Sequence, residues 1–595
     1  MDWGMAAVFL AAMLAIPFCV GLLLRVSSLQ RLRVLLRRVI AAGEAVEAYW
    51  LLWIFGILSF MLMRDYLENF SVGLEQIYNP LTRIEYALFW VPIPLAMSLL
   101  LFLLSGERLS RTSRLIVLFW PVTLLPPIVD FIASRGKGIA TDYIFNDLSR
   151  EYLGFMNISS IAGPATLGIK LEILVVCALL FIYVLLKSRS LLRAALTPLF
   201  GYSLIFFFFV TPKLVSLLTG RKLFVGHFNL YMILTHLALF VAFGMVWLVV
   251  YYRQEGSLPW TRSSQPPSSL SQGLPTAGHR RGAGVLRAVA SNLRLSRILH
   301  YALLTCGGFL LALLFLQEGP TGSQLLHLAL LLLGVSCAWL FAVFLNDIFD
   351  VETDRISESS RPLVSGSLSA RQHSVLSGIS FILAMLFSLL AGYAAWSFVL
   401  FFVVVYSFIY SAPPYRLRRF LLLPNVLIGL ASAAAMLAGF SIIYGEHALR
   451  IFPRDVLLMV VLAYTLSSTV KDLKDLKGDK LAGIRTLFTL LGELWGRFVC
   501  GLLLFTSYLL VPIFISTPSM WILGATGGAL AFAAMQRLGE RAQFIIEALF
   551  LAALFLMLAN LTAGTICQSS LFSTSLLKDV CLAPTDSSLW SRIVV

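Results

Sequence analysis

Apolar runs of about 20 residues recur along nearly the whole chain, separated by short polar segments. A run of that length can cross a membrane as an α-helix, since each residue adds about 1.5 Å. We therefore predict an all-α polytopic membrane protein. The spans are expected near residues 5–24, 48–63, 86–104, 115–132, 171–186, 194–218, 229–252, 298–316, 325–345, 373–391, 395–412, 421–444, 456–470, 486–515, 521–536 and 542–563.

The series of apolar runs is interrupted between residues 253 and 294. Residues 263–272 read Ser-Ser-Gln-Pro-Pro-Ser-Ser-Leu-Ser-Gln, and glycines and basic residues follow them. Such a composition cannot build a core, so it predicts a flexible basic linker. We expect a membrane domain of about seven helices at residues 1–252, a separate nine-helix bundle at 295–566 and a tail at 567–595.

The composition agrees with a membrane protein. The chain is 59% hydrophobic and 13% charged, whereas ordinary globular domains carry about 25% charged residues. The net charge of +15 does not indicate nucleic-acid binding, because no soluble basic module is present. Arginines instead gather in short loops, as is typical of the cytoplasmic side. This bias predicts an outside N-terminus and C-terminal tail and a cytoplasmic linker, and we expect a bacterial inner membrane.

A polar stretch follows the expected span 325–345 directly. If it continues as a helix, its carboxylates and one amide project within an arc of roughly 100°. These side chains are Asn346, Asp347, Asp350 and Asp354. Carboxylates crowded on one face repel each other unless cations bridge them. Magnesium suits such a face, since it binds one or two carboxylates and shares its other positions with phosphate.

A second acidic stretch follows the expected span 456–470, and the same topology places it on the cytoplasmic side. Asp472, Asp475 and Asp479 project within roughly 60° on a helix, and lysines from Lys471 onward alternate with them. One acidic stretch beside a membrane helix is usually a solvated loop. Two with matching spacing in one domain favour a shared magnesium and diphosphate site.

With these residues in this order, the segment from about 295 to 563 resembles the UbiA superfamily of intramembrane prenyltransferases. Four elements carry the resemblance: Asn346-Asp347-x-x-Asp350-x-x-x-Asp354, Arg361-Pro362-Leu-Val-Ser365-Gly366, the loop from Tyr410 to Arg419, and Lys471-Asp472-x-x-Asp475-x-x-Gly478-Asp479-x-x-x-Gly483-x-x-Thr486. The resemblance implies a nine-helix bundle around a central cavity that opens laterally to lipid.

The resemblance also implies roles for individual residues. Two Mg2+ ions are expected at Asn346, Asp347, Asp350, Asp354, Asp472, Asp475 and Asp479. Diphosphate contacts are expected from Asn346, Arg361, Arg416 and Lys471. Catalytic roles are expected for Asp350, Asp475, Lys471 and Tyr410. The tyrosines Tyr406, Tyr410 and Tyr464 are candidates to shield a carbocation by cation–π contact, although ordinary packing explains each of them as well.

The expected reaction is the transfer of a prenyl group from a prenyl diphosphate to a hydrophobic acceptor. The alternative is a non-catalytic protein that binds or transports polyprenyl phosphates; inverted repeats, which would favour a transporter, are not evident. The acceptor stays open between aromatic and lipid molecules. The spacing after Asp354 resembles members that use geranylgeranyl donors, but residues 357–360 lack the Asn and Pro usual in those groups.

The first domain carries no catalytic motif. Four polar residues lie within or close to its expected spans: Asp130, Glu172, Lys213 and His236. Ionisable residues in a membrane suggest function. The first three lie near span ends, so we expect them to reach the interface by snorkelling and to have structural roles.

Overall fold

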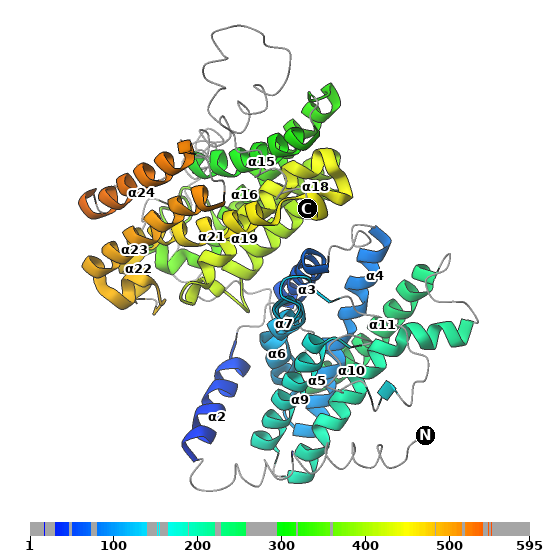
Figure 1. Ribbon diagram of the computed structural model, residues 1–595. Helices are drawn as coiled ribbons and strands as arrows, with labels where there is room; N and C mark the ends of the chain where they lie inside the picture. The colour runs from blue at the N-terminus through cyan, green and yellow to red at the C-terminus, as the bar shows by residue number, and fades with distance from the viewer. Residues whose placement is uncertain are drawn as a thin grey trace, which may run out of the picture. The chain divides into compact units, whose positions relative to one another are not determined.

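The computed structural model divides into two compact units, Met1–Gln265 and Pro266–Val595 (Figure 1). It describes residues 17, 30–46, 50–72, 80–139, 151–152, 154, 165–188, 190–219, 228–256, 294–316, 319–357, 361–481, 483–514, 518–538, 546 and 549. All regular secondary structure among these residues is helical, which confirms the all-α fold class. The division falls in the expected linker, most of which lies outside the described residues.

Eleven helices in the described part of the chain are long and apolar enough to cross a membrane. They are Arg83–Ser105, Leu109–Ala133, Leu167–Lys187, Leu191–Leu217, Met232–Glu255, Leu295–Leu316, Gly322–Val351, Ala370–Ala391, Leu423–Ile451, Arg454–Leu476 and Leu487–Ile513. Each coincides with an expected span, so the protein is an integral membrane protein. The expected spans 5–24 and 542–563 lie almost entirely outside the described residues.

The described residues of the first unit form ten helical elements. They are α2 (Gln30–Glu44), α3 (Trp50–Val72), α4 (Pro80–Trp90), α5 (Pro92–Ser105), α6 (Leu109–Phe119), η3 (Trp120–Leu124), α7 (Leu125–Ala133), α9 (Leu167–Lys187), α10 (Leu191–Thr219) and α11 (Phe228–Glu255). The expected span 115–132 is divided into α6, η3 and α7, because Pro121, Pro126 and Pro127 lack the N–H that a continuous helix needs. Thr166 caps α9 by accepting a hydrogen bond from Ile169 N.

Helix α2 is a feature that sequence reasoning did not anticipate. Four arginines that follow the first expected span, from Arg31 to Arg38, lie on this helix. Helix α2 is amphipathic and packs against α6 and α9. A basic amphipathic helix of this kind is typical of the membrane interface.

The second unit contains α16, the longest of the described helices. Its elements are α15 (Leu295–Leu316), α16 (Gly322–Ser357), α17 (Ala370–Ala391), α18 (Tyr393–Val403), the π-helix η4 (Val404–Ile409), η5 (Leu417–Arg419), α19 (Leu423–Tyr444), η6 (Gly445–His447), α20 (Ala448–Ile451), α21 (Arg454–Ser467), η7 (Ser468–Lys471), α22 (Asp472–Leu481), α23 (Leu487–Phe514) and α24 (Pro518–Leu538). Helix α16 packs along α17, and α23 packs along α24.

Two glycines set the crossing of α15 and α19. A Cβ atom added at Gly308 would lie 1.8 Å from the carbonyl oxygen of Met436, and one at Gly439 would lie 1.8 Å from that of Thr305. Only glycine fits at either position. This close backbone contact is the way small residues join helices in membranes.

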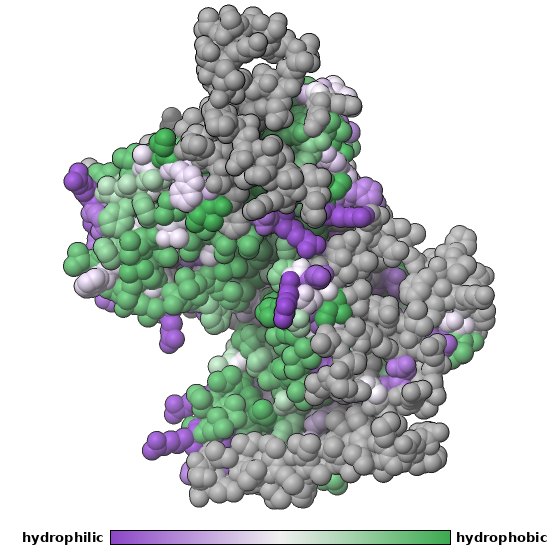
Figure 2. All heavy atoms as spheres, viewed as in Figure 1, coloured by the Kyte–Doolittle hydropathy of each residue, from purple (hydrophilic) through white to green (hydrophobic). Residues whose placement is uncertain are grey.

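The outer face of α23 and α24 is strongly apolar. Leu494 and Ile522 are 78% and 67% exposed, and Trp495 is also exposed. Figure 2 shows hydrophobic side chains covering this part of the surface, with hydrophilic ones at its margin. Such a surface is stable against lipid rather than water.

Candidate functional site

The first acidic cluster lies on the last turns of α16. The helix does not end with its apolar span but continues to Ser357, which keeps the expected helical spacing. Asp347, Asp350 and Asp354 are almost completely buried, at 1%, 1% and 5% exposure. Buried carboxylates need compensating partners, and each of the three has at least one arginine.

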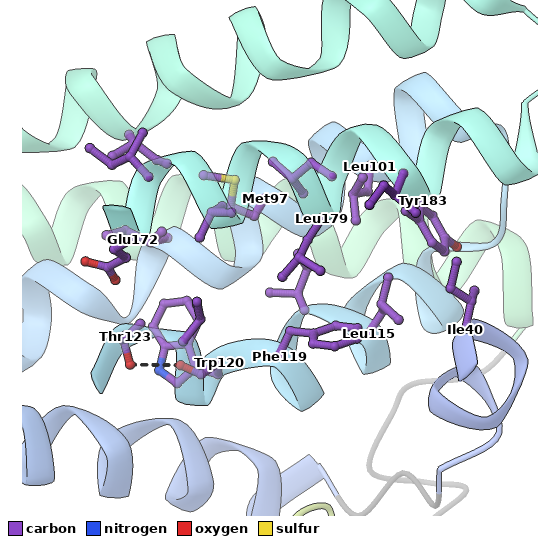
Figure 3. A pocket seen from close by; sticks show the side chains of 18 of the residues that line it. Ile40, Met97, Leu101, Leu115, Phe119, Trp120, Thr123, Glu172, Leu179 and Tyr183 are labelled. Atoms are coloured by element: carbon purple, nitrogen blue, oxygen red, sulfur yellow. Dashed lines mark hydrogen bonds between the residues drawn. The ribbon is translucent and has the colours of Figure 1, made fainter. Parts of the chain in front are cut away.

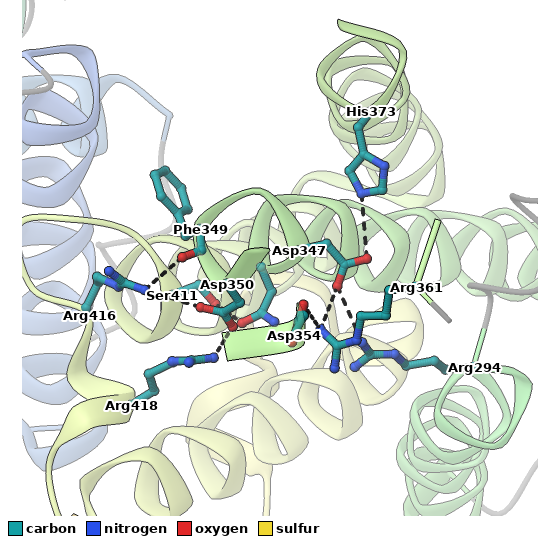
Figure 4. A network of polar contacts seen from close by, with 11 residues as sticks. Arg294, Asp347, Phe349, Asp350, Asp354, Arg361, His373, Ser411, Arg416 and Arg418 are labelled. Atoms are coloured by element: carbon teal, nitrogen blue, oxygen red, sulfur yellow. Dashed lines mark hydrogen bonds and ion pairs between the residues drawn. The ribbon is translucent and has the colours of Figure 1, made fainter. Parts of the chain in front are cut away.

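Asp350 is held by two arginines from the loop that follows η4. Arg416 Nη2 lies 3.3 Å from Asp350 Oδ1 and also donates to the carbonyl oxygen of Phe349 at 2.8 Å. Arg418 forms an ion pair with the other carboxylate oxygen (Figure 4). Arg416 has a left-handed backbone with φ 41°, a strained conformation that clusters at functional sites. The loop therefore directs two guanidinium groups at one carboxylate.

Asp347 and Asp354 share a different arginine. Arg361 Nη1 lies 3.1 Å from Asp347 Oδ1 and also pairs with Asp354. Asp347 further contacts Arg294 at 3.5 Å, and its Oδ2 lies 3.6 Å from Nε2 of the buried His373 on α17 (Figure 4). Asp347 is thus turned toward α17, whereas Asp350 is turned toward the Arg416 loop.

The second acidic cluster lies on α22, which packs against α16. Asp472 and Asp479 are buried, at 8% and 7% exposure. Arg418, which pairs with Asp350, is also within electrostatic range of the three α22 aspartates. Asp475 acts on Asp354 of α16 in the same way. The structure therefore brings the two acidic clusters together, with Arg418 between them.

Burial changes the protonation of two of these carboxyl groups. It raises the pKa of Asp354 to about 7, with Arg361 opposing the shift and Asp347 adding to it. Burial likewise raises the pKa of Asp479 to about 7, with a further rise from Asp475 and an opposing effect of Arg418. Neither group is fully ionised at neutral pH without an added cation.

Lys471 and Tyr410 lie beside the second cluster. Lys471 Nζ donates to Asn425 Oδ1 at 3.1 Å, pairs with Asp472 at 3.2 Å, and stands 5.7 Å from the centre of the Tyr410 ring. The rings of Tyr406 and Tyr410 are stacked at 5.2 Å. Tyr406 lies within the π-helix η4, which ends directly before Tyr410. A π-helix is frequent at functional sites.

The remaining candidates are distributed around this site. Asn346 Oδ1 accepts a hydrogen bond from Ser411 at 2.9 Å. Tyr464 packs against His300 of α15 at 4.7 Å and is not part of the Tyr406–Tyr410 stack. Of the three candidate tyrosines, Tyr410 and the stacked Tyr406 therefore lie on the side of Lys471.

The donor groups can be compared with what magnesium requires. Among the described residues, no group of three or more His, Cys, Asp or Glu side chains is arranged to hold a metal ion. Magnesium does not need such a cage, because it takes one or two carboxylates and completes its coordination with water and phosphate. Asp354 and Asp475, from two helices, lie near enough to interact. The donor set fits magnesium shared with a phosphate ligand.

Several partners in the site were missed by sequence reasoning. Arg418 lies in the loop from Tyr410 to Arg419, which the sequence analysis singled out. Its neighbours Arg416 and Arg419 could have indicated that Arg418 also contacts the acids. His373, Arg294, Asn425 and Ser411 are single polar residues in unremarkable surroundings. Only the folded chain places them at the acids.

In the first unit, the expectation that polar residues snorkel is wrong for Asp130 and Glu172. Both are buried, at 5% and 6% exposure. Asp130 accepts hydrogen bonds from Thr166 Oγ1 at 2.5 Å and Gly168 N at 2.7 Å, while Glu172 pairs with Arg64 at 3.0 Å. Both side chains therefore have partners inside the protein.

The other two polar residues of the first unit differ in burial. Lys213 is half-buried on α10. His236 is fully buried and packs edge-on against Phe89 at 5.4 Å.

Comparison with known proteins places this site in a family context. Residues 302–556 match the model of the UbiA prenyltransferase family. A digeranylgeranylglyceryl phosphate synthase from Sulfurisphaera tokodaii is 27% identical over 33% of this chain and 70% of its own length. A homogentisate phytyltransferase from Synechocystis is 29% identical over 25% of this chain and 51% of its own length.

Solved structures were compared as well. A UbiA homologue from Archaeoglobus fulgidus, bound to GPP and Mg2+, is 20% identical and aligns over 46% of this chain and 99% of its own, with a TM-score of 0.36.

Proposed function

Residues 302–556 belong to the UbiA prenyltransferase family, and from this premise we propose that the chain transfers a prenyl group from a prenyl diphosphate to a hydrophobic acceptor. The observation that carries the proposal is the meeting of two acidic clusters, on α16 and α22, around Arg418. Isolated acidic loops would have no reason to share an arginine. A pair of buried acidic faces with basic groups between them suits magnesium and diphosphate together.

The residues that would hold magnesium are the acids that face the shared region. On α16 these are Asp350 and Asp354, with Asn346 beside them; on α22 they are Asp472, Asp475 and Asp479. Asp347, turned toward His373 and Arg361, is better suited to position Arg361 than to bind a metal. When bound, magnesium would supply positive charge against the diphosphate oxygens.

The basic residues would bind the diphosphate. Arg361, Arg416 and Arg418 now pair with carboxylates, and a diphosphate with its cations would replace those pairings. Planar guanidinium groups match phosphate oxygens bidentately. Lys471 adds a positive charge next to Asp472. These groups are arranged to stabilise charge on a departing diphosphate.

The chemistry then needs little covalent help from the protein. The allylic carbon–oxygen bond breaks, and the diphosphate leaves with the electron pair. The stacked rings of Tyr406 and Tyr410 would stabilise the allylic cation through their faces. The acceptor nucleophile forms the new bond and loses a proton. Apolar surroundings limit hydrolysis of the cation.

The acceptor is an aromatic or lipid molecule in this proposal. The relatives named above include one enzyme of each kind, a digeranylgeranylglyceryl phosphate synthase and a homogentisate phytyltransferase. We further propose that both acidic clusters face the cytoplasm, because the arginine bias of the loops favours that orientation.

Release of pyrophosphate from geranylgeranyl diphosphate by the purified full-length protein tests the proposal. We expect magnesium-dependent release in the presence of an acceptor, and a loss of about 100- to 1000-fold in Asp350→Ala and Asp475→Ala. The matched control is Asp455→Ala, which changes an exposed aspartate of α21 and should leave release unchanged.

The outcomes separate the alternatives. Unchanged turnover in Asp350→Ala or Asp475→Ala contradicts the assigned roles. Binding of the prenyl diphosphate without release, for any acceptor offered, would favour the non-catalytic carrier. A homogentisate-type phenol and a prenylated glycerol phosphate should be offered separately, so that the acceptor class is read from the product by mass spectrometry.

A further inference from the structure

Helix α2 is attached to the first unit by one end. Its buried residues are Ile40, Gly43 and Glu44, all close to its C-terminus, and none of residues 30–39 is buried. Figure 1 shows α2 at the edge of the unit. We refer to residues 30–39 as the α2 arm. A helix of this length is marginal in water by itself, so the arm needs a surface that covers it.

The attached end of α2 lies where α9 ends. Glu44 accepts a hydrogen bond from the hydroxyl of Tyr183 at 2.9 Å and pairs with Lys187, the last residue of α9, at 2.8 Å. Ile40 lies beside Leu115 of α6, at the same end of an apolar pocket as Tyr183 (Figure 3). Because α9 is long and apolar enough to cross a membrane, its charged last residue marks the boundary between lipid and water. The attachment therefore places the arm at this boundary.

One face of the α2 arm is apolar and exposed. Leu32, Leu35 and Val39 are 42%, 57% and 50% exposed. Their spacing of three and four residues places them within about 60° of one another on the helix. Exposed apolar side chains at a membrane boundary are more stable among acyl chains than in water. This face therefore fits the lipid side of the boundary.

The α2 arm also carries four arginines without counter-ions. They lie outside the apolar arc of the helix, and they are Arg31, Arg33, Arg37 and Arg38. None of them forms an ion pair or a side-chain hydrogen bond with another residue that the structure describes. The single acid of α2, Glu44, already pairs with Lys187. Guanidinium groups bind phosphate oxygens bidentately, so the arm is complementary to phosphate beside an apolar phase.

From these observations we propose that α2 binds anionic phospholipids at the membrane surface. The apolar face lies among the acyl chains, and the arginines contact the phosphate groups. A zwitterionic lipid offers the same phosphate without a net charge, so it binds less well. Each arginine near an anionic membrane surface is worth about a fivefold preference. An acidic protein or a nucleic acid would satisfy the arginines but leave the apolar face in water.

The test concerns residues outside the family match and does not depend on the proposed transferase reaction. Full-length protein in phosphatidylcholine nanodiscs is labelled with either of two probes that carry the same diazirine on the same acyl chain. One probe is a phosphatidylglycerol and the other a phosphatidylcholine. Peptides from a pepsin digest are analysed by mass spectrometry. Helix α23 is the internal reference, because Leu494 is exposed there and Arg497 is already paired with Glu493.

We expect phosphatidylglycerol to label α2 at least about fivefold more than phosphatidylcholine, each normalised to α23. The double variant Arg31→Gln/Arg38→Gln should lower this excess about fivefold or more. Arg31→Lys/Arg38→Lys keeps the charge and should retain the excess. A second control, Arg135→Gln/Lys137→Gln, removes two charges from exposed residues that follow α7 and should leave the labelling of α2 unchanged.

Leu35→Gln tests the apolar face of the α2 arm separately. It should lower the labelling of α2 by both probes at least about threefold and leave their ratio unchanged. Equal labelling of α2 by the two probes, or the same excess in the glutamine double variant and the unmodified protein, would overturn the inference. An α2 that neither lipid labels would also overturn it, and would favour a protein partner such as a second copy of this chain.

Discussion

Both units bury ionised side chains, but they balance them differently. In the first unit, Arg64 on α3 pairs with Glu172 on α9, so both partners are fixed on long helices. In the second, the acids of α16 meet Arg361, Arg416 and Arg418, which stand outside the long helices. A pair fixed at both ends holds a fold together. Arginines on loops can exchange a carboxylate for a phosphate.

The comparison therefore teaches that buried charge alone does not identify a reactive site. What distinguishes the second unit is a surplus of acids on two adjacent helices and basic partners on connecting segments. Four predictions test this distinction, and they are given in order of expected effect.

The largest effect is expected from Arg64→Ala. Removing one partner of a buried ion pair leaves Glu172 uncompensated, which costs about 3–5 kcal/mol of unfolding free energy. Thermal or denaturant unfolding in detergent measures the loss. The matched control is Arg111→Ala, whose exposed pair with Glu107 should contribute at most about 1 kcal/mol. Equal losses in the two variants would show that the buried Arg64–Glu172 pair stabilises the first unit no more than an exposed pair does.

Arg418→Ala should act on turnover instead of stability. Its guanidinium lies between the two acidic clusters, so we expect kcat/KM for pyrophosphate release to fall about 100-fold, or roughly 3 kcal/mol. Arg418→Lys keeps a positive charge and should lose less of kcat/KM than Arg418→Ala. The control is Arg371→Ala, which changes an exposed arginine of α17 and should leave kcat/KM unchanged. A change in melting temperature without a change in turnover would show that this loop has a structural role like that of Arg64.

Magnesium dependence should change with pH. Burial raises the pKa of Asp354 and of Asp479 to about 7, so both acids lose their negative charge as the pH falls through 7. Magnesium binds the ionised form. Between pH 8 and pH 6 we expect the half-saturating magnesium concentration to rise about tenfold, equivalent to about 1.4 kcal/mol. Magnesium titrations of pyrophosphate release at each pH, with EDTA as the zero point, measure it; a flat dependence would mean that these acids are not ligands.

The smallest effect is expected at Tyr410. Tyr410→Phe keeps the ring that stacks on Tyr406 and should retain activity within about twofold. Tyr410→Leu removes the ring face and should slow release about fivefold to tenfold, in the range of one cation–π contact. Tyr444→Leu, which changes a stacked tyrosine at the C-terminal end of α19, is the control. Equal rates in Tyr410→Phe and Tyr410→Leu would assign the ring to packing alone.

Much of the fold could be predicted from the sequence because each membrane helix carries its own signal. The apolar runs predict the helices, and the spacing of Asp350 and Asp354 predicts that they share one helix face. Both predictions depend only on local periodicity. Arg64 and Glu172 could not be paired in this way. They are 108 residues apart, and no local pattern connects them.

Other details of the site depend on backbone distortions and tertiary contacts that the sequence pattern does not predict. The π-helix η4 changes the register between Tyr406 and Tyr410, and the left-handed Arg416 redirects its loop. Asp347 was expected at the metal with the other acids, and its contacts with Arg361 and with His373 on α17 follow no local pattern of the sequence. Such outcomes follow from tertiary packing, which overrides the ideal helical projection.

The glycine crossing of α15 and α19 has a consequence for how large molecules enter the second unit. Gly308 and Gly439 each pack against a backbone carbonyl of the other helix, so α15 and α19 cannot separate without losing this close contact. An apolar molecule that reaches the proposed site would have to enter between other helices of the second unit.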